Sequence, residues 1–482
     1  MMETKMRESL QGSMKNIVPN LELVFKVCYL VHLLMAFNAY FAGERIMNVT
    51  LVLTLFFGGL MGIMRLIRIK DYIIFPNVLW LIAFIGSYAV TALVNIRYGL
   101  FESAQYFVWL LFQFGLLYTF DWKRDRDEVR REFHIMAYVL IAILTIYNII
   151  GFVMLMQNQG FWHEAADGQI HRIGMAEWGR LHGLHADPNY GAVTSAVGLL
   201  LALYLIMCSK KIWIKVVLAI TILFQYLFVV FSVSRSGLIA AICGTAAFVG
   251  LYYLKKAKKH AIIISVIAVV VVAGALFGGS KVLIGSYNTY MEYRAEEPGD
   301  DITTKEPTIS REGDMEATGG DISNRRFSIW KSAVEIFISS PITGVGFRNI
   351  IPYAKDQLPS TYILKVNNQY GDFDAMHNVI MDTLASQGII GIVILGGFIV
   401  CTIVFLIRNF NTIREEHWVV DSVLFCCCLT IGVSSMFVSQ ILYVNNPNTY
   451  LFWALLGYLI YSMKRDGERI NRKTRKTGEV SK

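Results

Sequence analysis

His377 is the residue of this sequence best placed to accept a proton, because it directly precedes the long apolar run that begins at Asn378. The unperturbed pKa of a histidine is about 6.5, so its ring can take a proton from a hydroxyl group near neutral pH. Nine residues separate Asn378 from Gly388, and Gly391 follows three positions later. Taken alone, His377 can also be a loop histidine that caps or anchors the next helix.

Two arginines have the chemistry to bind a phosphate group. Arg235 lies in the sequence VSRSG between two apolar runs, and Arg180 precedes a further apolar run. A guanidinium group presents a planar fork of donors that matches phosphate oxygens in a bidentate way. A charge at the membrane is by default a functional hypothesis, although Arg235 can also snorkel to the membrane surface. Weaker candidates for a further cation are Arg348, Arg325 and Arg326.

Two short motifs raise metal and nucleotide binding as alternatives. His182, His185 and Asp187 form an H-x-x-H-x-D string, but this spacing alone is a weak signal for a divalent ion. Gly344 and Gly346 form a GxG without the strand–turn–helix unit and further glycine of a nucleotide-binding loop. We therefore predict no metal site and no cofactor.

Membrane helices must position these residues, since 55% of the 482 residues are hydrophobic and only 17% are charged. Apolar runs recur from Leu23 almost to the C-terminus, and about 20 apolar residues in a helix cross the ~30 Å hydrocarbon core of a bilayer. The sequence predicts an all-α polytopic membrane protein, with 1–482 as a single integral membrane domain. About twelve spanning helices are expected, at 23–42, 46–66, 72–96, 103–121, 133–156, 189–208, 212–232, 236–254, 261–279, 378–407, 419–443 and 447–463.

The basic residues predict how the chain crosses the membrane. Lys and Arg are concentrated in alternate connections and in the tail 464–482, and the positive-inside rule places these segments and both termini in the cytoplasm. The tail is expected to be solvated and to contact anionic lipid headgroups rather than nucleic acid. The polar first twenty residues show no cleavable signal peptide, so the first apolar run is expected to direct insertion.

Two connections on the predicted outer side are longer than hairpins. The first spans about 157–188, and the second, 280–376, is a large extracytoplasmic loop with an acidic, Gly/Thr-rich middle at 296–321. That middle has few apolar residues and is expected to be mobile. Phe327, Trp330, Val334 and Phe337 recur at helical spacing in the same loop, which predicts an amphipathic helix near 325–338 on the membrane face.

Three motifs together resemble the O-antigen ligase and O-antigen polymerase superfamily of membrane glycosyltransferases. They are SRSG at 234–237, PITGVG at 341–346 and HNVIMDTLASQGIIG at 377–391. The resemblance extends from about Arg180 to Gly391 and implies a GT-C-like fold. It implies that His377 is the general base and that Arg180 and Arg235 bind a diphosphate, with Arg348 as a weaker cation. The remaining motif residues are Asn378, Gly388, Gly391, Gly344 and Gly346, of which Gly388 and Gly391 are expected to let their helix pack closely.

The resemblance further implies a metal-independent, inverting glycosyltransferase of the bacterial inner membrane. Its donor is a glycan on a polyprenyl diphosphate, such as undecaprenyl diphosphate, and its acceptor is a hydroxyl group on lipid A-core or on a growing polysaccharide. Ligase and polymerase remain equally open. A protein O-oligosaccharyltransferase and a flippase or transporter for lipid-linked glycans are the alternatives, the last because twelve helices with both ends inside is also a common transporter plan.

Overall fold

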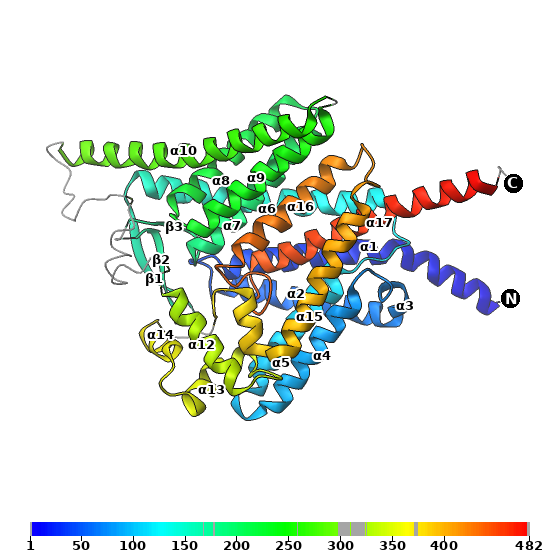
Figure 1. Ribbon diagram of the computed structural model, residues 1–482, viewed down its shortest axis with the longest axis horizontal. Helices are drawn as coiled ribbons and strands as arrows, with labels where there is room; N and C mark the ends of the chain where they lie inside the picture. The colour runs from blue at the N-terminus through cyan, green and yellow to red at the C-terminus, as the bar shows by residue number, and fades with distance from the viewer. Residues whose placement is uncertain are drawn as a thin grey trace.

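Helices dominate the computed structural model of the chain (Figure 1). The structure describes residues 2–166, 168–176, 179–257, 259–296, 309, 323, 325–370 and 375–479. Its longer helices are α1 (Met2–Ala36), α2 (Arg45–Ile67), α4 (Val78–Val94), α5 (Leu100–Leu110), α6 (Arg126–Met156), α7 (Pro188–Cys208), α8 (Ile212–Phe231), α9 (Arg235–Lys256), α10 (Ala261–Glu296), α12 (Arg326–Ser339), α15 (Val379–Phe410), α16 (Trp418–Ser434) and α17 (Pro447–Glu479). Shorter elements are α3 (Ile69–Tyr72), α13 (Ile350–Gln357), α14 (Tyr362–Tyr370), the 3₁₀ turns η1 (Ile96–Tyr98) and η3 (Phe347–Asn349), and the π-helical stretch η2 (Leu111–Tyr118).

The predicted fold class is confirmed. In the part of the chain that the structure describes, nine helices are long and apolar enough to cross a membrane. The other three predicted spans correspond to the shorter apolar helices α4 and α16 and to α17. The chain is therefore an all-α polytopic membrane protein.

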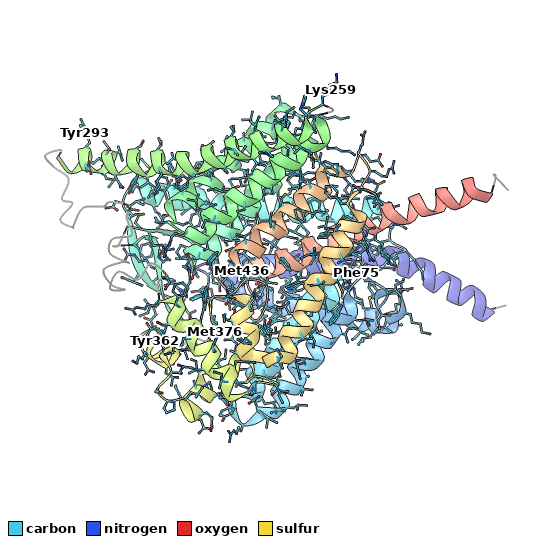
Figure 2. All side chains as sticks on the ribbon, viewed as in Figure 1. Phe75, Lys259, Tyr293, Tyr362, Met376 and Met436 are labelled. Carbon is cyan, nitrogen blue, oxygen red and sulfur yellow. The ribbon has the colours of Figure 1, made fainter. Side chains whose placement is uncertain are left out.

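The two ends of the helix bundle differ in what they carry. Figure 1 shows both termini at one end, whereas the small sheet and α12 to α14 gather at the opposite end. Figure 2 shows Lys259 and Phe75 toward the termini, and Tyr293 and Tyr362 on the other side. The basic connection at Lys259 thus lies at the same end as the termini, as the charge alternation predicts. We call the end that carries the sheet and α12 the distal end.

A three-stranded antiparallel sheet occupies the connection between α6 and α7, where the sequence indicated only a loop. Its strands are β1 (Gly160–Glu164), β2 (Ile170–Met175) and β3 (Leu181–Gly183), in the order β1-β2-β3. The sheet sits tightly on α6, since a Cβ atom added to Gly151 would lie 3.2 Å from the Cα of Gly183. This contact fixes β3 and, with it, the preceding Arg180.

The large connection 280–376 begins inside a helix. α10 continues to Glu296, well beyond the predicted end of its span at 279, because nothing between these positions breaks the helix. The acidic middle that we expected to be mobile lies almost entirely outside the described residues. Beyond it, α12 occupies the position predicted for the amphipathic helix and packs against α15 and α14.

An irregular segment replaces the last third of one predicted span. α16 ends at Ser434, and residues 435–446 form turns and bends before α17 begins. Ser439, Gln440 and Asn446 in this segment are fully buried. Non-helical backbone at membrane depth requires partners inside the protein, and these polar side chains supply them. The segment 435–446 packs beside the start of α15, where the candidate site lies.

Buried charges join α1, α2 and α6 elsewhere in the bundle. The ammonium group of Lys26 lies 2.9 Å from Glu22 and 2.5 Å from Glu132. Arg65 pairs with Glu22 at 2.8 Å, and Arg124 pairs with Glu132 at 2.7 Å. All five side chains are at most 7% exposed. We call this group the α1 charge cluster; the sequence analysis did not find it, because its members are far apart in the chain.

Candidate functional site

His377 lies in the turn that leads into α15, and Asn378 is the N-cap residue of that helix. The side-chain oxygen of Asn378 accepts hydrogen bonds from the backbone N–H groups of Ile380, at 2.9 Å, and Met381, at 3.2 Å. Its amide group donates to the carbonyl of Met436, at 2.9 Å. Asn378, and not His377, therefore caps α15, and it also ties this helix to the segment 435–446.

The backbone at His377 is held in an unusual conformation by its neighbours. Its φ angle is +52°, in the left-handed region that few residues other than glycine adopt. The indole N–H of Trp330 donates to the carbonyl of Met376 at 3.0 Å, and the Met376 N–H donates to Asp382 at 2.7 Å. The Ser439 hydroxyl donates to the other oxygen of Asp382, whose side chain is buried. Side chains from α12, α15 and the segment 435–446 thus converge on the turn.

The surroundings of His377 favour its neutral form. Burial lowers the pKa of His377, and the positive charge of Arg326 lowers it further, to about 4. Both effects penalise the imidazolium ion. At neutral pH the ring is therefore uncharged and retains a nitrogen lone pair, which is the form that a general base requires.

Three arginines from different elements act on one another at the distal end. Burial lowers the pKa of the Arg326 guanidinium, and the charges of Arg235 and Arg180 add to this effect, while Asp187 opposes it. An arginine remains protonated in a protein despite such a shift. The group therefore concentrates positive charge beside His377, which suits an anionic ligand.

The local structure explains how two of these arginines are presented. Arg180 is oriented by hydrogen bonds from its guanidinium to the carbonyl of Ser232, at 3.0 Å, and to the side chain of Asn189, at 3.1 Å. Arg235 is exposed and is the first residue of α9, whose N-cap residue Ser234 accepts a hydrogen bond from the N–H of Gly237. The positive end of a helix dipole therefore reinforces the charge of Arg235.

A cavity of about 300 Å³ lies where Arg235 and Arg326 meet the aromatic face of α12. Phe327, Trp330 and Phe437 supply aromatic surface to its lining. Trp330 contributes to both parts of the site, because its ring lines the cavity and its N–H binds the turn before His377. The cavity thus brings two cations and an aromatic wall together, next to the turn that carries His377.

Gly388 interrupts α15 so that the segment 341–346 can dock against it. Its φ angle is +59°, and a Cβ atom there would lie 2.6 Å from the carbonyl oxygen of Pro341. The N–H of Ile389 donates to that carbonyl at 2.9 Å. On the other side, a Cβ atom on Gly344 would lie 2.5 Å from the backbone nitrogen of Gln387. The close approach allowed by these glycines is to the segment 341–346 rather than to another long helix.

The remaining motif glycines complete this junction. Gly346 donates its N–H to the carbonyl of Ser386 at 2.8 Å. Gly391 lies one turn after the break, and a Cβ atom there would lie 2.4 Å from the Cβ of Gln387. The PITGVG and HN-x9-GxxG motifs, which are far apart in the sequence, therefore form one structural unit beneath the site.

The structure does not bring Arg348 to the arginine group. Arg348 lies on η3, is exposed, and stands over the ring of Phe347 with 5.9 Å between guanidinium and ring centroid. Its charge acts on Tyr88 of α4. Arg326, which the sequence ranked no higher than Arg348, takes the third position beside Arg180 and Arg235. No spacing rule marks it, because the acidic middle of the connection separates it from Arg235.

The H-x-x-H-x-D string does not converge on one point. His185 contacts the side-chain oxygen of Asn148 at 3.0 Å, and Asp187 caps α7 by accepting the N–H of Asn189 at 2.6 Å. Within the described ranges, no three His, Cys, Asp or Glu side chains are grouped so that they could hold a metal ion.

Fold and site together define a polytopic membrane protein with a cationic, aromatic-lined cavity at its distal end. The model of the family described as O-antigen ligase matches residues 218–396, a range that includes Arg235, Arg326 and His377. The match confirms the resemblance to the O-antigen ligase and polymerase superfamily, whose members are glycosyltransferase-like enzymes. An uncharacterized protein of Haemophilus influenzae is 24% identical over 218 residues, which are 44% of this chain and 48% of that protein. The match thus spans about half the length of this relative.

Proposed function

We propose that this protein transfers a glycan from a polyprenyl diphosphate carrier to an acceptor hydroxyl group at the outer face of the bacterial cytoplasmic membrane. The observation that carries the proposal is a cavity lined by Arg235 and Arg326, in which Arg326 interacts electrostatically both with Arg180 and with a neutral His377. Three cations match the charge of a diphosphate. The histidine supplies the base that the acceptor needs.

The arginines act on the leaving group. When the bond between the anomeric carbon and the diphosphate oxygen breaks, negative charge develops on the diphosphate. Arg180 is held in place by its hydrogen bonds to Ser232 and Asn189, so little reorganisation is needed as the charge grows. Preorganised cations of this kind can contribute several kcal/mol to a reaction, on the order of 3 kcal/mol for one group.

His377 acts on the acceptor. Its neutral ring accepts the proton of the attacking hydroxyl group as the new glycosidic bond forms and the diphosphate departs. A single displacement of this kind inverts the configuration at the anomeric carbon. The diphosphate bond supplies the driving force, so the proposed reaction needs neither a metal ion nor another cofactor.

Three kinds of acceptor hydroxyl fit the proposed reaction. A second lipid-linked repeat unit makes the protein a polymerase, lipid A-core makes it a ligase, and a protein hydroxyl makes it an O-oligosaccharyltransferase. The aromatic wall of Phe327, Trp330 and Phe437 suits the apolar face of a sugar ring, which all three reactions present.

A flippase or transporter for lipid-linked glycans is the second candidate. Transporters of many families place ionisable residues at the bilayer midplane, on broken helices, and the α1 charge cluster and the broken α15 meet parts of that description. The charges of the α1 cluster are paired with one another, however, and the three arginines lie at the distal end. Enzyme chemistry at the distal end accounts for more of the observations.

The test is the length distribution of polyprenyl-linked glycan in cells that lack the protein or carry His377→Ala. His260→Ala is the matched control, because His260 is exposed and next to Lys259 at the end of the termini. Single repeat units should accumulate outside the membrane for a polymerase, and long lipid-linked chains for a ligase or protein glycosyltransferase. Accumulation inside would support the transporter. An unchanged donor pool in the His377 variant would refute the enzyme.

A further inference from the structure

A second cavity, of about 370 Å³, lies far from the distal end. Its walls come from the last turns of α9 and α15 and from the facing parts of α16 and α17, at the end where Figure 1 places the termini. Most of its lining is aliphatic or aromatic, including Leu251, Leu406, Phe425, Leu459 and Met463. One carboxylate, Asp421, also lines it.

Asp421 is a buried acid without a matching cation. The side chain is 2% exposed, and among the described residues neither carboxylate oxygen makes a hydrogen bond of ordinary geometry, although the Ser462 hydroxyl lies near enough to interact with it. Arg126 and Arg130 act on it electrostatically, but the Arg126 guanidinium is paired with Asp466 at 2.6 Å, and Arg130 is hydrogen-bonded to Tyr204. His417 contacts the same Asp466 at 3.1 Å. A buried carboxylate is stable when it is paired and hydrogen-bonded, so the cavity offers a place for a cationic ligand group.

The rim of the cavity has the opposite charge. Lys255 lies one turn after Leu251 on α9, and its ammonium group stands 5.3 Å from the ring centroid of Trp418, the first residue of α16. Ile407 and Phe410 line the cavity and are 68% and 37% exposed, so the cavity opens on the apolar, lipid-facing surface. A molecule that fits must combine an ammonium group, a nearby phosphate and hydrocarbon chains.

We propose that this cavity is a binding site for an aminophospholipid of the phosphatidylethanolamine type. The ammonium group pairs with Asp421, the phosphate lies toward Lys255, and the acyl chains follow the aliphatic wall. A choline headgroup lacks N–H donors and is larger, so the site discriminates against phosphatidylcholine. This lipid site is independent of the proposed glycosyl transfer, because it lies at the other end of the molecule.

The test uses the full-length protein in nanodiscs made from equal parts of dioleoyl phosphatidylethanolamine and dioleoyl phosphatidylcholine. Lipids retained after detergent extraction are counted by native mass spectrometry. Wild type should retain ethanolamine lipid about tenfold in preference to choline lipid, since a charge-assisted hydrogen bond is the strong kind. Asp421→Asn keeps the shape of the side chain and should remove the preference. Glu415→Gln, at an exposed acid six residues earlier, should keep it.

Two further arms make the result decisive. Ile407→Trp, at the exposed rim, should lower the retention of both lipids by occupying the space of an acyl chain while leaving Asp421 intact. Free ethanolamine at millimolar concentration should not displace the lipid. Equal retention of both lipids by wild type, or a preference unchanged in Asp421→Asn, would overturn the proposal. Complete displacement by free ethanolamine would show that the site takes a small amine rather than a lipid.

Discussion

Replacing Asp382 with asparagine tests whether the turn at His377 is positioned for catalysis. Asp382 accepts the N–H of Met376 with one oxygen and the hydroxyl of Ser439 with the other. Neither Met376 nor Ser439 belongs to the lining of the cavity, so these two bonds hold the turn rather than a ligand. Its role in the proposed reaction is therefore that of a positioning residue.

The expected magnitude follows from these two bonds. Asparagine keeps one acceptor for the Met376 N–H, and its amide can donate to the Ser439 hydroxyl, which can turn to accept. Two charge-assisted bonds become two neutral ones, each weaker by about 1 kcal/mol. If half of the lost energy appears as misplacement of His377 in the transition state, kcat should fall about fivefold. The KM for the donor should change less than twofold, because the arginines are untouched.

The assay is transfer of a radiolabelled lipid-linked glycan to acceptor by purified protein in liposomes. Asp382→Ala should be more severe, because the buried N–H of Met376 loses its acceptor. Asn368→Ala, at an exposed position of α14 before the turn, is the control and should retain wild-type kcat. The reasoning would be refuted if Asp382→Asn raised KM while kcat stayed unchanged, because the acid would then act on donor binding.

Three further perturbations bear on the charge, the backbone and the stability of the bundle. Arg326→Gln removes a charge that lowers the pKa of His377, so this pKa should rise from about 4. Because the neutral base is lost as pH falls through the pKa, the acid limb of the plot of kcat against pH should move to higher pH. An unchanged limb would count against its assignment to His377. Gly388→Ala should lower the thermal midpoint, because its Cβ would meet the Pro341 carbonyl at a left-handed φ, whereas Gly396→Ala in the same helix, with open space around it, should not. Lys26→Met removes one cation of the α1 charge cluster and leaves Glu22 and Glu132 with only the arginines as partners. It should reduce the free energy of unfolding by about 3–5 kcal/mol, measured by steric trapping in bicelles. Lys123→Met, in which the 71% exposed Lys123 loses its pair with Asp71, should cost less than about 1 kcal/mol.

The spans were predictable because bilayer thickness leaves few solutions for an apolar run. Length and composition located the nine described helices that are long and apolar enough to cross a membrane, and the other three predicted spans coincide with α4, α16 and α17. The errors fall where a local signal was missing. α10 continues to Glu296 because the stretch 280–296 contains no proline and the single Gly285 does not interrupt the helix. α16 stops at Ser434 because the buried polar residues that follow find partners outside a helix. Mean hydropathy cannot show where α16 ends, because it reflects the average preference of each residue type for lipid over water and not the hydrogen-bond partners that a residue finds in the fold.

The site was only partly predictable, for the same physical reason. His377 and Asn378 could be singled out because a titratable ring and a capping residue meet at a helix start. Arg326 could not be ranked above Arg348, because their local sequences do not tell which one faces Arg235. Asp382 has no sequence signal as a positioning residue, since its partners Met376 and Ser439 are brought together only by the fold.

The glycines of the two motifs make a close backbone contact whose partner their spacing in the sequence does not indicate. The spacing suggested a helix face of small residues, yet Gly388 approaches the backbone of Pro341 and Gly344 approaches the backbone of Gln387, so both lie in a backbone junction between segments about forty residues apart. That junction fixes the break in α15, and the break lies three turns below the turn at His377. The motif is therefore best understood as the support of the base: its glycines set where α15 bends, its asparagine sets where α15 begins, and the histidine is presented between them.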